Sequence, residues 1–387
     1  MQREASRPRP DWPARCEQIG FAFHSLDGYW REDVRYRFGA AEIDELEAAT
    51  AELHGLYLAA VEHVVRARAY ERFAIPEPFL GLIEASWEAD GEAEQLELYG
   101  RFDLAYTGAG PPILLEYNAD TPTTCIEMLA QWVWLEDLLA AGELPAAADQ
   151  FNSFHERMIE RWRDVARRFD GDLLHLACQQ GSLEDWCNVA YLGDLARQVG
   201  LDTKIIDVGD VGWDAEAGVW RDGDEVQIRN LFCLYPKEWL MREAFGPHLL
   251  LDRWNLVEPM WKALVANKAM LPVLWALNEG HPNLAPAYYD AGPLRSGLYV
   301  RKPVLSREGA NVTVYSGSLV VEETGGGYGG AGFVHQRFAP LFEAGDGRHC
   351  VLGAWAVGPT PAGITVREFP GLVSTNLSNF VPHYLLG

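Results

Sequence analysis

A short turn of two glycines and two prolines, residues 108–112, separates two segments in which polar and apolar side chains alternate, 96–106 and 113–117. Alternation with a period of two is typical of β-strands, and a Gly/Pro-rich turn between two such segments predicts a β-hairpin. This pattern constrains the fold most tightly, because it sets two distinct faces on each strand. Polar side chains on one face must meet solvent, partner charges or a ligand.

The hairpin carries four polar residues that are candidates for a site. Arg101 and Asp103 share a face of the first strand, and Glu116 and Asn118 share a face of the second. The strand register, which the sequence leaves open, decides whether the two faces coincide. If they do, two carboxylates and an amide oxygen converge beside an arginine, a set that suits Mg²⁺ better than zinc. The alternative is that the four residues cover the solvated face of an exposed hairpin.

A second candidate cluster is basic. Lys268 lies near a helix end, Arg301 and Lys302 lie in an apolar strand, Arg307 lies in the turn after it, and Arg367 lies in a late strand. Burial of an ammonium group without a partner is costly, so Lys302 requires an anionic neighbour. Only five of the 32 basic residues are lysines, which favours sites that need a compact point charge, such as nucleotide phosphates. Internal pairing with some of the 56 acidic residues is the alternative.

The turn from Arg307 to Asn311 could fold its backbone amides over a phosphate. The P-loop and Rossmann glycine motifs are both absent from the sequence. The glycine cluster at 325–332 is interpreted as a surface connection. Cys125 opens a predicted helix, where its thiolate would be stabilised, although a buried structural cysteine fits the same position.

Hydrophobic periodicity predicts the remaining elements. A strand, a helix and a strand in succession, over 173–208, predict a parallel α/β layer. Thr123 or Thr124 is available as the N-cap of the helix at 125–141. One or two helices are predicted over 41–73, and further helices over 125–141, 149–168, 183–199 and 257–277, the last interrupted at Asn267, Lys268 and Pro272. The other predicted strands cover 173–178, 203–208, 298–304, 311–321, 351–357 and 364–369.

Composition excludes several classes of protein. A formal net charge of −24 repels nucleic acid and anionic lipid. The six cysteines are widely spaced, which disfavours zinc knuckles and disulfide frameworks and fits reduced thiols in a cytosol. Neither a signal peptide nor a membrane span is evident, so we expect a cytoplasmic protein.

Five separated motifs, taken in order, resemble the synthetase domain of the glutathionylspermidine synthase family. The likeness extends from about residue 20 to the end of the chain. The motifs are Arg-Phe-Asp at 101–103, Glu-Tyr-Asn-Ala-Asp-Thr-Pro at 116–122, Asn-Lys-Ala-Met-Leu-Pro at 267–272, Tyr-Val-Arg-Lys-Pro at 299–303 and Phe-Val-Pro-His-Tyr at 380–384.

The resemblance implies an α+β, ATP-grasp fold with a pre-ATP-grasp α/β portion, in a permuted arrangement. We expect a helical segment at 1–95, a lobe with the metal-binding hairpin at 96–255, and an ATP-grasp lobe at 256–387. The implied Mg²⁺ ligands are Asp103, Glu116 and Asn118, and Arg101 is the implied transition-state arginine. The residues expected to bind ATP are Lys268, Lys302, Arg307, Asn311 and Arg367.

The implied activity is an ATP- and Mg²⁺-dependent ligase that joins a carboxylate to an amine through an acyl phosphate. A glutathione-like peptide and a polyamine are the expected substrate classes. Bifunctional members carry an N-terminal amidase, and none is expected here, because the chain begins close to the synthetase motifs. The rival functions are a non-catalytic nucleotide- or partner-binding protein that keeps the clamp, and a kinase-like enzyme that stops at the phosphorylated intermediate. Oligomeric state is left open.

Overall fold

The predicted hairpin exists as β3 (Tyr99–Ala105) and β4 (Ile113–Asn118) in the computed structural model of the protein, which describes residues 1–90, 96–251 and 254–387. It belongs to a six-stranded sheet with the order β19-β18-β17-β3-β4, in which β16 also pairs with β17. The other strands of this sheet are β16 (Phe342–Gly345), β17 (Arg348–Val357), β18 (Thr360–Pro370) and β19 (Asn379–Val381). The strands predicted at 351–357 and 364–369 are confirmed, and both are longer than predicted.

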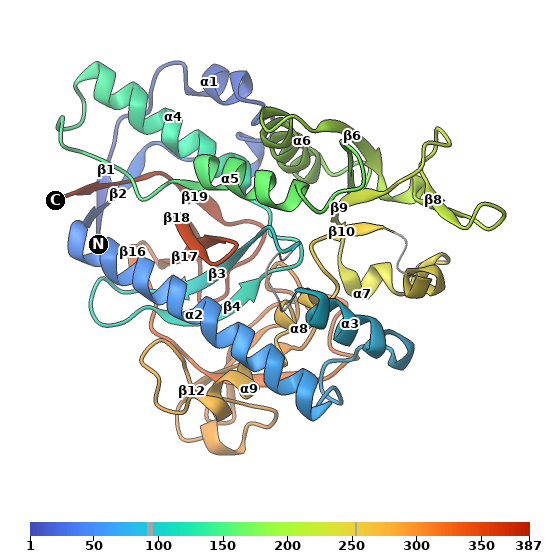
Figure 1. Ribbon diagram of the computed structural model, residues 1–387. Coiled ribbons are helices and arrows are strands. Elements are labelled where there is room, and N and C mark those ends of the chain that lie inside the picture. The colour runs from blue at the N-terminus through green and yellow to red at the C-terminus, as the bar shows by residue number, and fades with distance from the viewer. Residues whose placement is uncertain (91–95, 252–253) are drawn as a thin grey trace.

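Helices cover both faces of this sheet. The long helix α2 (Ala40–Ala67) runs across one face (Figure 1), where the rings of Phe102 and Tyr117 stack with their centroids 3.7 Å apart. At the other face, α4 (Cys125–Ala141) packs against β18, and α5 (Phe154–Ala166) packs against both β17 and β18. Of the one or two helices predicted at 41–73, the structure has one, which ends at Ala67 because Arg68 takes a left-handed conformation with a φ of 52°.

A separate four-stranded sheet is wholly parallel, with the order β10-β9-β5-β6. Its strands are β5 (Leu173–Cys178), β6 (Asp202–Asp207), β9 (Asn230–Leu234) and β10 (Asn255–Val257). Helix α6 (Leu183–Gln198) connects β5 to β6. The predicted parallel α/β layer is therefore confirmed. The adjoining elements are β7 (Gly212–Asp214), β8 (Val219–Arg221) and α7 (Lys237–Leu240).

A five-stranded antiparallel sheet follows in the chain, with the order β11-β15-β12-β13-β14. The single strand predicted at 311–321 is wrong, because the chain reverses at Gly317, which has a φ of +62°. The segment 325–332 connects β14 to β15, as predicted. The strands are β11 (Ala287–Tyr288), β12 (Leu298–Pro303), β13 (Thr313–Ser316), β14 (Leu319–Glu323) and β15 (Phe333–Arg337).

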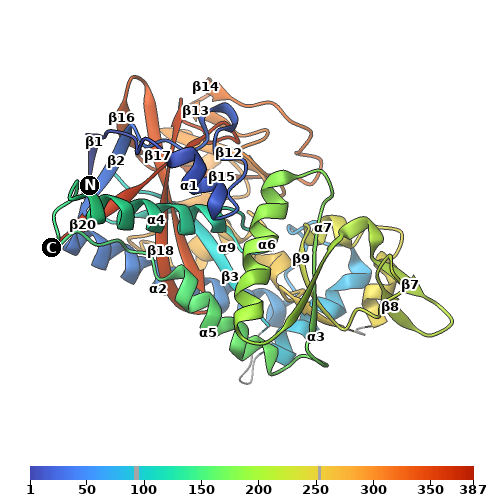
Figure 2. The same cartoon turned by 90° about the horizontal axis from the view of Figure 1, so that it is seen from above.

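The two ends of the chain meet in one small sheet, in which β2 lies between β1 and β20. The N and C labels lie close together in Figures 1 and 2. The strands are β1 (Gln2–Ala5), β2 (Val34–Gly39) and β20 (His383–Leu386). Two further helices are α1 (Trp12–Gln18) and α3 (Leu80–Asp90).

Two further predicted helices differ from the structure. The helix predicted at 149–168 starts at Phe154, because Asp149 and Asn152 instead form β-bridges with Leu385 and Gly363. The segment 257–277 contains the end of β10 and two short helices, α8 (Lys262–Val265) and α9 (Met270–Leu277). The predicted break at Asn267 and Lys268 is present, but Pro272 does not interrupt α9, because it lies in the first turn, where a backbone N–H is not needed.

The fold therefore combines helices with parallel and antiparallel sheets. The three domains proposed at 1–95, 96–255 and 256–387 stay a prediction. Across the described ranges, no helix combines the length and apolar character needed to cross a membrane.

Candidate active site

The register of β3 and β4 settles the question that the sequence leaves open. Arg101 lies opposite Asn118, and Asp103 lies opposite Glu116. All four side chains line one cavity of about 440 Å³. The two polar faces therefore coincide, and the hairpin presents both of them to this cavity.

Residues from many different helices, strands and turns line the cavity. Eight of the nine residues expected from the sequence line it, and only Asn311 of the expected set is not among its lining residues. The expected residues that line it are Arg101, Asp103, Glu116, Asn118, Lys268, Lys302, Arg307 and Arg367.

Asp103 is buried between two arginines. Its Oδ1 accepts a hydrogen bond from Nε of Arg101 at 2.9 Å, and its Oδ2 accepts one from Nη2 of Arg367 on β18. Burial alone would raise the pKa of Asp103, but the positive charges of Arg101 and Arg367 outweigh it and hold that pKa below its ordinary value. The carboxylate is therefore ionised at neutral pH.

Glu116 has a lysine as its partner. Its Oε2 lies 3.0 Å from Nζ of Lys268, which also donates to the Ser306 carbonyl at 2.9 Å. Burial would raise the pKa of Glu116, but the charges of Lys268 and Lys302 lower it below the ordinary value. Two anionic carboxylates thus lie opposite each other across the hairpin, each neutralised by a cation.

Lys302 is buried without a carboxylate within ion-pair distance in the described part of the chain. Its Nζ donates to the Leu115 carbonyl and to Oε1 of Gln336, both at 2.8 Å. Burial lowers the pKa of Lys302 to about 8, and the nearby charge of Glu116 offsets only part of that effect. Within the described ranges, internal pairing with a carboxylate, the alternative to an anionic ligand, is absent at Lys302 and present at Lys268.

The turn after β12 closes over the cavity. Nη1 of Arg307 donates to Oγ1 of Thr121 at 2.7 Å, and the guanidinium lies over the ring of Trp239. Asn311 has a φ of +56° and its Oδ1 accepts a hydrogen bond from the amide of Tyr328 at 2.7 Å. Asn311 therefore fixes the glycine-rich connection at 325–332, and its predicted contact with ATP stays a prediction.

Arg101 reaches the site because a neighbouring residue has no side chain. Gly353 on β17 lies opposite Asp103, and a Cβ there would come within 2.8 Å of Cδ of Arg101. The Arg101 guanidinium also donates to the Thr123 carbonyl at 2.9 Å and to Oγ1 of Thr124 at 3.2 Å. Thr124 occupies the N-cap position of α4, as predicted, but its side chain makes no capping hydrogen bond.

Cys125 behaves as a structural residue. It is fully buried, and burial raises the pKa of its thiol well above the ordinary value. The stabilised thiolate considered from the sequence is therefore wrong, and the buried structural alternative holds. Desolvation outweighs the position in the first turn of α4.

Several residues at the site were not predicted from the sequence. Tyr29 lines the cavity, and its hydroxyl donates to Oε1 of Glu127. Burial, reinforced by the charge of Glu184, raises the pKa of Glu127 to about 8. The one available signal is a carboxylate in the otherwise apolar start of the helix at 125–141. Glu184 and Gln336 line the cavity too, and no motif marks either of them.

The donor set of the hairpin fits a magnesium ion by its chemistry. Asp103 and Glu116 are ionised, and Asn118 lines the same cavity on the neighbouring strand, where its amide oxygen supplies a third donor. Hard oxygen donors from carboxylates and an amide are the ligands that Mg²⁺ takes. No group of three His, Cys, Asp or Glu side chains in the described residues forms a metal-binding cluster, so any cation held here relies on the amide as well.

Comparison with known proteins gives one consistent result. The profile of a family described as glutathionylspermidine synthase preATP-grasp matches residues 3–386. A proposed acid–amine ligase of Haemophilus influenzae is 37% identical over 402 residues, and the alignment covers 100% of both chains.

Two more distant relatives are longer than this chain. Trypanothione synthetase of Crithidia fasciculata is 26% identical, with 84% of this chain and 52% of that enzyme aligned. The bifunctional glutathionylspermidine synthetase/amidase of Escherichia coli is 25% identical, with 87% and 57% aligned. A solved structure of a glutathione synthetase-like effector from Globodera pallida, in its apo form, shares the fold with a TM-score of 0.55 at 9% identity, and covers 98% of this chain and 100% of that one.

Replacement of Gly353 tests how Arg101 is placed. A Cβ at this position would lie 2.5 Å from Oγ1 of Thr365 as well as against Arg101. We therefore expect Gly353→Ala to lower the free energy of unfolding by about 1–3 kcal/mol. Gly212→Ala is the matched control, because a Cβ there meets its nearest atom at 3.9 Å, and it should leave stability unchanged or raise it by about 0.5 kcal/mol. Urea unfolding measures both variants, and equal stabilities would contradict the crowding at Gly353.

Proposed function

The chain belongs to the glutathionylspermidine synthase family and is an ATP-dependent acid–amine ligase, and we propose that it forms an amide bond through an acyl phosphate in the cavity between the hairpin and β12. The observation that carries this proposal is the convergence of oxygen ligands and lysines. Asp103, Glu116 and Asn118 line the same cavity as Lys268 and Lys302. Such a set suits a metal-bound nucleotide.

We assign the fold as ATP-grasp in a permuted arrangement, with the metal ligands early in the chain and the nucleotide lysines late. The antiparallel sheet that carries Lys302 and the sheet that carries the hairpin would clamp the nucleotide between them. Lys268 and Lys302 would bind its phosphates, and Arg307 and Arg367 lie on the cavity wall where they can add further positive charge. Asn311 would act through the turn that it supports.

Asp103, Glu116 and Asn118 would hold Mg²⁺, which when bound neutralises phosphate charge and orients the transferring group. The arginines on Asp103 and the lysine on Glu116 keep both carboxylates ionised, and so ready to accept a cation. Positively charged Arg101, only 2.9 Å from Asp103, would offset the negative charge that builds on the transferring phosphoryl group.

The proposed reaction balances in two steps. A substrate carboxylate oxygen attacks the γ-phosphorus, the bond from that phosphorus to the bridging oxygen breaks, and ADP leaves with the electron pair. An amine nitrogen then attacks the acyl carbon, the carbon–oxygen bond to phosphate breaks, and the amine loses a proton. The products are an amide, ADP and inorganic phosphate.

We propose a small peptide resembling glutathione as the acid and a cationic amine such as a polyamine as the acceptor. The names of the longer relatives support these classes, and this chain spans only about half of those enzymes. The acidic side chains of Glu184, Asp185 and Glu308 on the cavity wall support a cationic substrate. The cytoplasmic location expected from the sequence fits both substrates.

The proposal is tested by ADP and phosphate release from the purified protein with Mg²⁺ and ATP. Acids and amines are added singly and in pairs, and mass spectrometry identifies products. We expect release that requires both an acid and an amine, with a condensation product. ATP binding without turnover by any pair would favour the non-catalytic alternative, and acid-dependent release of ADP without an amide would favour the kinase-like one.

Loss of one site charge should abolish this turnover. Lys302→Ala and Asp103→Ala are each expected to lower kcat/KM at least about 100-fold, because each removes charge from the proposed phosphoryl-transfer site. Lys204→Ala is the control, since Lys204 pairs with Asp222 and Asp224 away from the lining of this cavity. Circular dichroism checks that the variants fold, and full activity in either site variant would refute the assignment.

The lowered pKa of Lys302 predicts how nucleotide affinity depends on pH. Below about 8 the ammonium of the free protein is charged, and above it the amine is neutral. ATP affinity should therefore fall as the pH rises through 8, approaching about tenfold per pH unit. Binding at about pH 9 should take up close to one proton, because the phosphate restores the charged form.

Isothermal titration calorimetry in buffers of different ionisation enthalpy measures both quantities. Lys302→Arg keeps its charge throughout this range, so its affinity should lose the pH slope even where it binds more weakly. A wild-type affinity that does not vary with pH above about 8 would contradict the phosphate contact of Lys302.

A further inference from the structure

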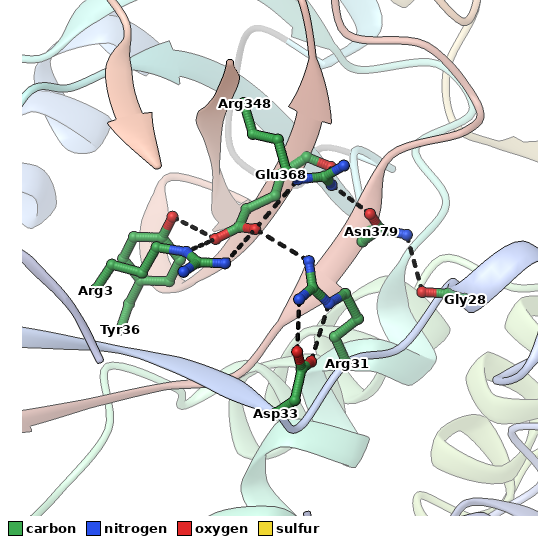
Figure 3. Close-up of polar contacts among 8 residues, drawn as sticks. All are labelled: Arg3, Gly28, Arg31, Asp33, Tyr36, Arg348, Glu368 and Asn379. Atoms are coloured by element: carbon green, nitrogen blue, oxygen red, sulfur yellow. Dashed lines mark hydrogen bonds and ion pairs between the residues drawn. The ribbon is translucent and has the colours of Figure 1, made fainter. Parts of the chain in front are cut away.

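A second concentration of charge lies on β18, beside the candidate active site and on the opposite side of the strand. Glu368 is fully buried, and three arginines surround its carboxylate. Arg3 donates to both carboxylate oxygens, from Nε at 2.6 Å and from Nη2 at 3.1 Å. Figure 3 shows these contacts, which come from elements far apart in the sequence.

Three further residues contact the Glu368 carboxylate. Arg31 approaches Oε2 at 3.4 Å, the hydroxyl of Tyr36 donates to Oε1 at 2.7 Å, and Nε of Arg348 lies 3.5 Å from Oε2. The arginines are only 23–26% exposed. We call Glu368 with Arg3, Arg31, Tyr36 and Arg348 the Glu368 network. A buried carboxylate held by this many donors fixes the strand that carries it.

The residue before Glu368 belongs to the active site. Successive side chains of a strand point to opposite faces, so Arg367 reaches Asp103 while Glu368 faces the sheet made by both chain ends. In the register, Arg367 lies opposite Val351 of β17 and Phe380 of β19. Any shift of β18 that moves Glu368 also moves Arg367 away from Asp103.

The same network also supports a second residue of the cavity wall. Arg348 donates to Oδ1 of Asn379, whose Nδ2 donates to the Gly28 carbonyl at 2.9 Å. Gly28 precedes Tyr29 and Arg31 lies two residues after it, and Tyr29 lines the cavity and donates to Glu127. The backbone amide of Phe380 donates to the Tyr29 carbonyl at 2.6 Å. Figure 3 shows how Arg348, Asn379 and Gly28 follow one another.

We propose that the Glu368 network is a positioning device for the active site, in which Arg3 and Arg31 of the N-terminal segment hold β18 so that Arg367 contacts Asp103 and Tyr29 faces the cavity. The inference rests on the proposed function for its effect on turnover, but its structural part does not. Glu368, Arg3 and Arg31 are positioning residues that touch no substrate.

Arg3→Gln is the test variant, because Glu368 keeps Arg31, Arg348 and Tyr36 as partners and the buried charge stays compensated. Glu368→Gln is the stronger variant. Asp222→Asn is the matched control, since Asp222 is also buried and multiply bonded, to Lys204 at 2.5 Å and His175 at 3.1 Å, but does not line the cavity. All variants are compared by urea unfolding, so that global stability is known before activity is measured.

Amide hydrogen exchange gives a readout that does not depend on turnover. We expect peptides covering 364–369 to exchange at least about tenfold faster in Arg3→Gln after correction for global stability, and unchanged in Asp222→Asn. For turnover, we expect Arg3→Gln to lower kcat about tenfold, with the KM for ATP within about twofold, since a small misplacement of a catalytic group acts on the chemical step.

Combination with Arg367→Lys separates positioning from general destabilisation. Arg3→Gln should add nothing to the kcat of Arg367→Lys, whereas Asp222→Asn should change kcat in neither background. Unchanged exchange at 364–369, or kinetic effects of Arg3→Gln and Arg367→Lys that multiply, would overturn the proposal. If the wild-type protein forms no amide with any substrate pair, the proposed function fails, and hydrogen exchange still decides whether the network holds β18.

Discussion

The proposed active site depends on the ion pairs that hold the Asp103 carboxylate between Arg101 and Arg367. Arg101 is two residues away on the same strand, and Arg367 is 264 residues further along the chain. A buried carboxylate needs such compensation, because desolvation alone would favour its protonated form. The pairing of β3 with β17 and of β17 with β18 brings these groups together. The strand pairing of this sheet therefore also places the two arginines that keep Asp103 ionised.

The sequence predicts local features of this site well, because they follow from alternation along a strand. Arg101 and Asp103 share a face for that reason, as do Glu116 and Asn118. The coincidence of the two faces depends on register, and the contact of Arg367 with Asp103 depends on pairing across two strands, so neither could be read from spacing. The left-handed conformation of Gly317 divides the strand predicted at 311–321 into two. The β-bridges of Asp149 and Asn152 move the start of the helix predicted at 149–168 to Phe154.

The scarcity of lysine in the sequence points to candidate phosphate-binding residues, but it does not separate them from lysines that serve the packing of the fold. Four of the five lysines are buried, and they differ in what neutralises them. Lys237 pairs with Asp120 at 2.7 Å and Lys262 with Glu258 at 2.5 Å, so both serve the packing of the fold. Lys268 pairs with Glu116 in the cavity, and among the residues that the structure describes Lys302 has only a carbonyl and an amide oxygen as hydrogen-bond acceptors. Burial without a carboxylate partner, more than residue type, distinguishes Lys302, the lysine that we propose binds an anion.

A crystal structure with Mg²⁺ and a non-hydrolysable ATP analogue tests the central claim most directly. The account predicts a metal ion bound by oxygens of Asp103, Glu116 and Asn118, with phosphate oxygens in contact with Lys268 and Lys302. Arg367 should remain next to the Asp103 carboxylate or turn to the phosphates within the same cavity. A nucleotide bound elsewhere, or phosphates that touch neither lysine, would contradict it.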